Sequence, residues 1–298
     1  MAYDSYRQQV VLFGGSAGGG TLDDTWILHG RTWSTRHPPS HPGALAVELM
    51  AYDARTHTCL LVGSATIQGP AQTWSWDGTT WTRLSDLPLE GVEGPQTLAF
   101  DPATGHALLL SAMPSDAGIG SHRTRAWTWD GRSWTLGAAP PSFADTAGEA
   151  RLATVGVGSS SRNGRGVLAL FEDAIGTHET WFWDGVTWSK RAAGGTPLYD
   201  PELSSTLAED TTTGDVVLIG LARSDGRSAQ TWLWDGTSWR QGVAAPLAAS
   251  AYHGTLVLSD AASGHAIVIG ESTSGNLVNL FDVLWTFDGN SWVSDRGA

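Results

Sequence analysis

A tryptophan motif recurs six times along the chain, and this repetition most constrains what the chain can fold into. The clearest copies read Trp-x-Trp-Asp-Gly followed by a further tryptophan, at residues 74–81, 127–134, 181–188 and 232–239. Weaker copies lie at 26–33 and 285–292, and the six copies account for all 16 tryptophans. Successive copies begin 48, 53, 54, 51 and 53 residues apart. A period of about 50 residues indicates a repeat protein in which each copy is one supersecondary unit.

A short apolar run accompanies the tryptophan motif in five of the units. The runs are VVLFG, CLLVG, ALLLS, VVLIG and AIVIG, and each ends ten residues after an aspartate. Between aspartate and run lies turn chemistry such as Asp101-Pro-Ala-Thr-Gly105, in which the carboxylate can accept nearby amides and the glycine tolerates positive φ. His57, His106 and His265 follow these turns and are interpreted as structural.

Each unit is therefore predicted to form four antiparallel strands, A to D. Strand A ends at the aspartate, B is the apolar run, C carries Trp-x-Trp, and an Asp-Gly turn leads to D, which the last tryptophan opens. No segment shows helical periodicity. Six such units predict an all-β, six-bladed β-propeller. We expect one domain over residues 1–298, with blades at about 1–36, 37–84, 85–137, 138–191, 192–242 and 243–298.

The chain resembles the kelch-repeat family, in which strand B ends in a double glycine and an aromatic-Asp pair in C precedes a tryptophan in D. Gly14-Gly15 and the WDG…W strings match this pattern, although the double glycine survives only in the first unit and the fourth unit lacks the aspartate turn. The resemblance implies an architecture similar to the central domain of galactose oxidase. The copper site of that enzyme type needs a Cys–Tyr crosslink, whereas Cys59 lies inside an apolar run, so we expect no copper site.

The amino-acid composition narrows the classes of partner that we expect the protein to bind. The formal net charge is -13 and the pI about 4.9, which argues against a nucleic-acid or acidic-membrane partner because phosphate binding needs a basic face. One cysteine cannot form an internal disulfide, and neither an apolar run of membrane-spanning length nor a signal peptide is apparent. We expect a cytoplasmic monomer without cofactor or metal, since His37 and His41 share a proline-rich loop that gives their spacing no fixed geometry.

Function is predicted on the side of the propeller that carries the B–C and D–A connections, here called the loop face. These connections are long and differ in every unit, whereas the A–B and C–D connections of the opposite turn face are short and repetitive. The longest B–C loops belong to units 3 and 6. The former is polar, with His122 and Arg125, and the latter is apolar, with Leu277 and Phe281. These loops either bind an amphipathic ligand or merely pack onto their own blades.

Candidate catalytic groups are the ionisable residues nearest the channel mouth. Glu48 and Arg151 begin strand A of their units and form either an acid–base pair or a structural ion pair. His178-Glu179, preceded by Glu172-Asp173, form an acid–base group, since histidine titrates near neutral pH, or are exposed polar residues of a loop. The candidate catalytic set is Glu48, Arg151, His178 and His253, and the candidate ligand-binding set is Gln96, His122, Arg125, Glu172, Tyr199, Tyr252, Leu277 and Phe281.

Two functions remain open from the sequence. The first is a small-molecule site at the channel mouth, of a cofactor-independent isomerase, cyclase or lyase that uses shape and acid–base groups. The second is a non-catalytic protein-interaction scaffold on the same loop face. Divergent loops and the absence of an attached partner domain in these 298 residues favour the first.

Overall fold

The computed structural model describes most of the strands and many of their connections. The described residues are 1–17, 19–30, 32–66, 69–89, 94–114, 122–138, 153–160, 166–172, 178–191, 207–221, 229–245, 256–260, 263–270 and 283–294. No helix occurs within these ranges, and hence none that is long and apolar enough to cross a membrane. The chain divides into two compact units, residues 1–150 and 151–298.

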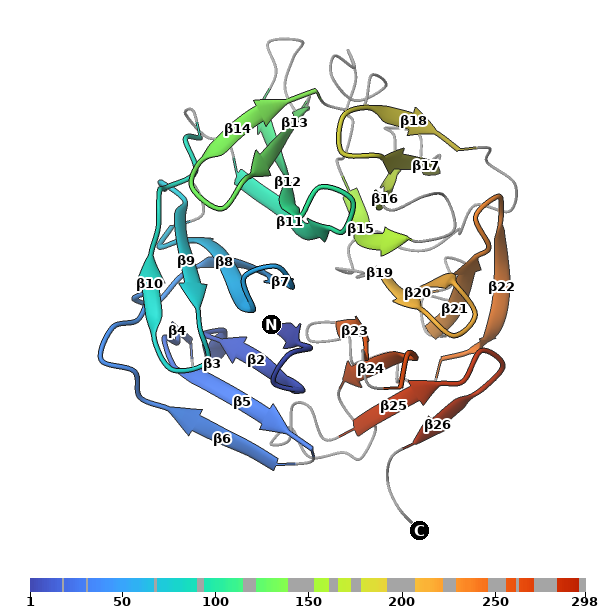
Figure 1. Ribbon diagram of the computed structural model, residues 1–298, viewed down its shortest axis with the longest axis horizontal. Helices are drawn as coiled ribbons and strands as arrows, with labels where there is room; N and C mark the ends of the chain where they lie inside the picture. Colours follow the sequence, from blue (N-terminus) through green and yellow to red (C-terminus); the bar gives the residue numbers. More distant parts are fainter. Residues whose placement is uncertain are drawn as a thin grey trace. The chain divides into compact units, whose positions relative to one another are not determined.

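The first unit contains three antiparallel sheets of four strands, which we number blades 1 to 3 (Figure 1). Blade 1 consists of β1 (Ala2–Asp4), β2 (Gln9–Phe13), β5 (Thr25–His29) and β6 (Thr32–Arg36). Blade 2 consists of β7 (Val47–Asp53), β8 (Thr58–Ser64), β9 (Gln72–Trp76) and β10 (Trp81–Arg83). Blade 3 consists of β11 (Gly94–Asp101), β12 (His106–Pro114), β13 (His122–Trp129) and β14 (Trp134–Gly137).

The second unit repeats this arrangement in blades 4 to 6. Blade 4 consists of β15 (Ala153–Ser160), β16 (Gly166–Glu172), β17 (His178–Trp183) and β18 (Trp188–Lys190). Blade 5 consists of β19 (Leu207–Asp210), β20 (Asp215–Leu221), β21 (Ala229–Trp234) and β22 (Trp239–Ala244). Blade 6 consists of β23 (Leu256–Ser259), β24 (Ala266–Gly270), β25 (Val283–Phe287) and β26 (Trp292–Ser294). Four antiparallel strands per blade are thus confirmed.

Strand position within a blade explains the hydrophobic pattern. The B strands lie inside their sheets, and in blade 2 the strand β8 packs against blade 1 on one face and blade 3 on the other, so it is buried without interruption from Cys59 to Ser64. The D strands form the sheet edge, and β10 buries only its first residue, Trp81. A strand buried on both faces is continuously apolar, whereas an edge strand keeps polar residues in water.

The Asp-Gly turns between C and D form the tight connection that the sequence predicts. In blade 2 the Asp77 carboxylate accepts the backbone N–H groups of Thr79 and Thr80, each over 2.8 Å. Gly78 adopts φ +100°, a conformation that side chains other than glycine rarely tolerate. The same carboxylate contacts recur at Asp130, Asp184, Asp235 and Asp288.

Neighbouring blades are joined by a repeated indole–hydroxyl contact. The D-strand tryptophan of one blade donates its Nε1–H to the threonine that precedes the first tryptophan of strand C in the blade before it. The four pairs are Trp81–Thr25 (2.9 Å), Trp134–Thr73 (2.8 Å), Trp239–Thr180 (2.8 Å) and Trp292–Thr231 (2.8 Å). These tryptophans also contact the second aromatic of their own strand C at centroid distances of 5.0–5.5 Å. Within each unit the tryptophans therefore pack between blades.

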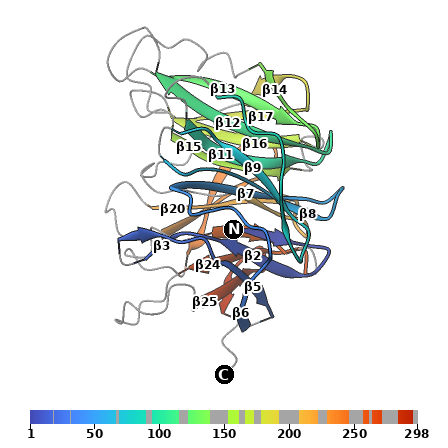
Figure 2. The same cartoon turned by 90° about the vertical axis from the view of Figure 1, so that its left-hand side faces the viewer.

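The first blade carries one addition to the four-strand plan. Its B–C connection forms a small hairpin of β3 (Ser16–Ala17) and β4 (Gly20–Thr21). In the side view, β3 lies at the left-hand edge, on the loop face of the first unit (Figure 2). This hairpin follows Gly14 and Gly15 directly in the chain.

Candidate functional site

The predicted site residues fall into three groups. Glu48 and Arg125 are described with their side chains. Gln96, His122, Glu172 and His178 lie in β11, β13, β16 and β17, but their side chains are outside the described part. The remaining candidates lie outside the described residues: Arg151, His253, Tyr199, Tyr252, Leu277 and Phe281. The pairing of Glu48 with Arg151 consequently stays a prediction.

Strand register brings two of the candidates together. Glu172 ends β16 and His178 begins β17, and the two are direct cross-strand partners at the loop-face end of blade 4. The backbone of blade 4 thus places Glu172 and His178 at the same register position. Their role in a site stays a prediction.

Glu48 lies at the loop-face end of blade 2, where it meets blade 1. It is the second residue of β7 and pairs with Gly63 of β8. Its Oε1 accepts the backbone N–H of Gly15 over 3.3 Å, and Gly15 follows the end of β2 in blade 1. The carboxyl group is partly buried, while Gly15 is exposed. The position predicted from repeat alignment therefore places an ionisable group at the junction of two blades.

The environment of Glu48 favours its neutral form. Burial is the largest cause and raises the pKa of the carboxyl to about 7, with the negative charge of Asp24 acting in the same direction. The Gly15 N–H and the positive amino group of Met1 act in the opposite direction and lower it. Near neutral pH this carboxyl exchanges readily between its two protonation states, which is the property that a general acid or base needs.

Asp24 is a neighbour of Glu48 that the sequence reasoning missed. Its Oδ2 accepts the indole N–H of Trp26 over 2.5 Å, and its carbonyl accepts the N–H of Gly14 over 2.9 Å. Its Oδ1 is buried and, within the described residues, has no hydrogen-bond partner. In the sequence, Asp24 stands two residues before the first tryptophan of strand C. At the same position in their blades, Gln72 and Glu179 also accept the indole N–H of that tryptophan, and this shared position could have identified Asp24.

His41 contacts the backbone of its own loop and lies near an aspartate. Its Nδ1 lies 3.9 Å from Asp23 Oδ2 and 2.7 Å from the carbonyl oxygen of Pro42. Groups of three or more potential metal ligands do not occur among the residues that the structure describes.

Arg125 and His122 are predicted from the sequence to lie in the B–C loop of blade 3, and this placement is wrong. The pairing of β12 with β13 continues as far as Pro114 and His122, so both candidates lie in a strand. Arg125 is partly buried and pairs with Ser111 of β12 near the loop-face end of the blade. Blades 2 and 3 pack through a shared apolar cluster that includes Val62, Leu109 and Trp127.

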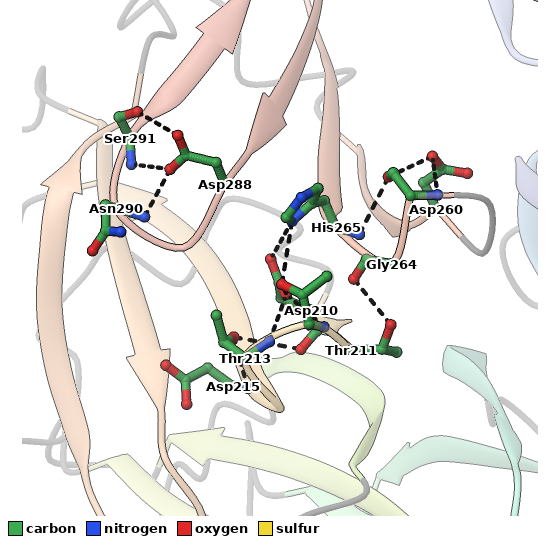
Figure 3. Close-up of polar contacts among 12 residues, drawn as sticks. Asp210, Thr211, Thr213, Asp215, Asp260, Gly264, His265, Asp288, Asn290 and Ser291 are labelled. Carbon is green, nitrogen blue, oxygen red and sulfur yellow. Dashed lines mark hydrogen bonds and ion pairs between the residues drawn. The ribbon is translucent and has the colours of Figure 1, made fainter.

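The turn face carries polar contacts that join blades instead of forming a site. In blade 5, buried Asp210 accepts the N–H groups of Thr212 and Thr213 within its own turn. Its Oδ2 lies 3.2 Å from Nδ1 of His265 in blade 6, and Thr211 donates its hydroxyl to the carbonyl of Gly264 over 3.1 Å (Figure 3). The backbone N–H of Thr211 donates to the same carbonyl over 2.7 Å. This geometry agrees with the structural interpretation of His265.

Comparison with known proteins shows the fold. No family model and no curated protein matches the chain, so the kelch resemblance is not confirmed. The SapL1 lectin solved with α-methyl fucoside has a TM-score of 0.66 at 15% identity, over 100% of this chain and 94% of the lectin. The fucose-specific lectin of Aleuria aurantia has 0.59 at 14%, over 98% and 95%, and an α-L-arabinanase of Penicillium chrysogenum, solved with arabinobiose, has 0.54 at 12%, over 83% and 80%. The predicted six-bladed β-propeller with four antiparallel strands per blade is confirmed.

Proposed function

We propose that this protein binds a small, hydroxyl-bearing organic molecule at the loop face of blades 1 and 2, with Glu48 as its acid–base group. The observation that carries the proposal is the Glu48 carboxyl, which is partly buried at a blade junction and has a pKa of about 7. A carboxyl group in a structural ion pair or on the surface has no need of a pKa this high, whereas perturbed pKa values cluster at functional sites.

The groups around Glu48 suit a ligand with hydroxyl donors. Glu48 and Asp24 supply carboxylate oxygens, and Asp24 Oδ1 is a buried acceptor without a partner among the described residues. Hydrogen bonds to charged acceptors are stronger than those between neutral groups, and leaving a buried acceptor unpaired costs free energy that a donor can recover. Two proteins of similar fold were solved in complex with ligands of this chemical class, one with α-methyl fucoside and one with arabinobiose.

A cofactor-independent isomerase, cyclase or lyase activity is the finer form of the proposal. Such reactions need a group that gives and takes a proton near neutral pH, and Glu48 meets this requirement. The further candidates from the sequence stay predictions within their own units: Gln96, His122 and Arg125 in the first, and Arg151, Glu172, His178, Tyr199, Tyr252, His253, Leu277 and Phe281 in the second.

Titration of defined ligands tests the proposal. The full chain is titrated by calorimetry with α-methyl fucoside, L-fucose, arabinobiose and a panel of small polyols and hydroxy acids, at pH 5.5 and 8. We expect at least one to bind, and Glu48→Gln to weaken that binding about 10-fold and to remove its pH dependence. Asp86→Asn, which changes an exposed carboxylate outside the site, is the matched control.

Two results would contradict the proposal. If no compound of the panel binds, or if Glu48→Gln binds as the wild type does, the site assignment is wrong. Capture of one stoichiometric protein partner that is insensitive to Glu48→Gln would instead favour the interaction scaffold. Conversion of a bound compound by the wild type but not by Glu48→Gln would support the catalytic form.

A further inference from the structure

Two departures from the repeat pattern meet at one point of the structure. Gly14-Gly15 is the only double glycine at the end of a strand B, where the corresponding pair in blade 2 is Gly63-Ser64. Glu48 is the only carboxylic residue among the aligned starts of strand A in blades 2 to 6. The Gly15 N–H to Glu48 Oε1 hydrogen bond joins these two departures across 33 positions of sequence.

Gly14 suits a left-handed backbone conformation and leaves the space that the Glu48 carboxyl group occupies. A Cβ atom at Gly14 would overlap Oε1 of Glu48 and would lie 2.8 Å from its Cδ, closer than real Cβ atoms come to other atoms. The residue also has φ +65°, in the left-handed region. Gly15 differs, because its φ of +105° requires glycine while an added Cβ would find nothing within 4 Å.

We propose that Gly14 and Gly15 are positioning residues that hold the Glu48 carboxyl group in the orientation in which it contacts the ligand. The space over Gly14 together with the Gly15 N–H is called the seat of this carboxyl group. The inference rests on the proposed function for the identity of that ligand, but the seat itself is a property of the free protein. Gly14 supplies the space for the carboxyl, and Gly15 supplies the N–H that fixes Oε1. Because Gly15 is exposed, the seat remains open to solvent on that side.

The seat explains why the carboxyl does not turn outward into water. Rotation of the Glu48 side chain toward solvent would relieve the burial that disfavours its charge, and the Gly15 hydrogen bond opposes this rotation. Filling the space over Gly14 must displace the carboxyl, and because the side chain is flexible, it would move outward. The proton affinity of Glu48 therefore reports directly on whether the seat is occupied.

Carbon-13 NMR titration of the Glu48 carboxyl tests the seat in the absence of ligand. The Glu48 resonance is assigned by its loss in Glu48→Gln. Gly14→Ala is expected to lower the titration midpoint from about 7 to below about 6, because burial is the main cause of the elevation. Gly30→Ala is the matched control, since Gly30 lies in the same blade with φ +58° and an added Cβ there would find nothing within 4 Å. Its midpoint is expected to stay near the wild-type value.

A second measurement needs only the wild type and Glu48→Gln, so it holds even if Gly14→Ala does not fold. The amide proton of Gly15 is expected to shift with the same midpoint as Glu48 and to lose this titration in Glu48→Gln. A Gly15 amide that ignores the titration overturns the seat, and so does a folded Gly14→Ala with an unchanged midpoint. An equal shift in Gly14→Ala and Gly30→Ala also overturns it. A confirmed seat together with failure of every ligand would refute the proposed function alone.

Discussion

The indole N–H of Trp81 donates to the hydroxyl of Thr25 over 2.9 Å, although the two residues lie 56 positions apart and in different blades. Both are almost fully buried, with 1% exposure each. The same contact recurs three times, so one local sequence pattern, a threonine before the first tryptophan of strand C, provides the joint for the next blade. At the corresponding position, blade 3 has Ala126 and blade 6 has Leu284, the last blades of the two compact units.

Removing the hydroxyl from this joint is expected to destabilise the protein. Thr25→Val keeps the shape of the side chain but leaves the Trp81 N–H buried without an acceptor, at a cost of about 1–2 kcal/mol. Urea unfolding at pH 7 measures the loss. The control is Thr82→Val, an exposed position in the same strand as Trp81, for which we expect a change within about 0.5 kcal/mol. Equal effects of the two substitutions would contradict the role of the joint.

The Asp-Gly turns are expected to make stability depend on acid pH. Hydrogen bonds from the backbone N–H groups of Ser238 and Thr237 are the main causes that lower the pKa of Asp235 to about 2. A carboxyl whose pKa is lower in the folded state adds stability above its unfolded pKa of about 4, and this is lost as the pH falls toward 2. Because the turn is near solvent, we discount the contribution to about 1 kcal/mol.

Asp235→Ala measures this contribution. Its free energy of unfolding should fall below that of the wild type by about 1 kcal/mol or more at pH 7, with a smaller difference at pH 2.5. Asp86→Ala serves as control, since its exposed ion pair with Arg83 contributes little. A pH-independent effect of Asp235→Ala would show that the turn does not act through the charge of the carboxylate.

Glu48 is expected to act on stability in the opposite direction. Its folded pKa of about 7 exceeds its unfolded value of about 4.5, so the folded state binds the proton more tightly. Ionisation therefore costs stability as the pH rises from about 4.5 to 7. After discounting for partial exposure, this cost is about 1–2 kcal/mol.

Glu48→Gln removes the ionisation and should gain this amount relative to the wild type between pH 4 and pH 8. Unfolding curves of both proteins at the two pH values provide the comparison, with Asp86→Asn as a control that should show no such gain. A stability difference that does not change with pH would mean that the Glu48 carboxyl titrates normally.

The contact between His265 and Asp210 is expected to fasten the turns of blades 5 and 6. His265→Ala removes the 3.2 Å contact with buried Asp210 and should loosen the adjacent bond from the Thr211 N–H to the Gly264 carbonyl. Hydrogen exchange of the Thr211 amide should accelerate about 5- to 10-fold, which corresponds to roughly 1 kcal/mol. Asn290→Ala, which alters a nearby exposed turn position, should leave that rate unchanged (Figure 3). Unchanged exchange in His265→Ala would show that the backbone contact alone joins the turns.

The candidate site was only partly accessible from sequence. Repeat alignment located Glu48, because the start of strand A is defined by its distance from the aspartate turn. The partners Gly14, Gly15 and Asp24 were not identified, since they belong to the preceding blade and nothing in the local pattern states which side chain they face. The altered proton affinity of Glu48 follows from burial, which is a property of assembled blades.

The sequence by itself determined the blades. Apolar runs, aspartate turns, Trp-x-Trp segments and Asp-Gly turns are local signals, and the six copies of the tryptophan motif at about 50 residues are sufficient to predict the architecture. Only the tertiary structure decided which residues meet between blades, such as Trp81 with Thr25 and Glu48 with Gly14 and Gly15. The physical reason is range: hydrogen-bonded turns and strand pairs form within a unit, whereas burial, close approach and pKa depend on the surface of the adjacent unit. The glycine pair illustrates the difference, since in sequence it marks the end of a strand and in the structure it holds a carboxyl group.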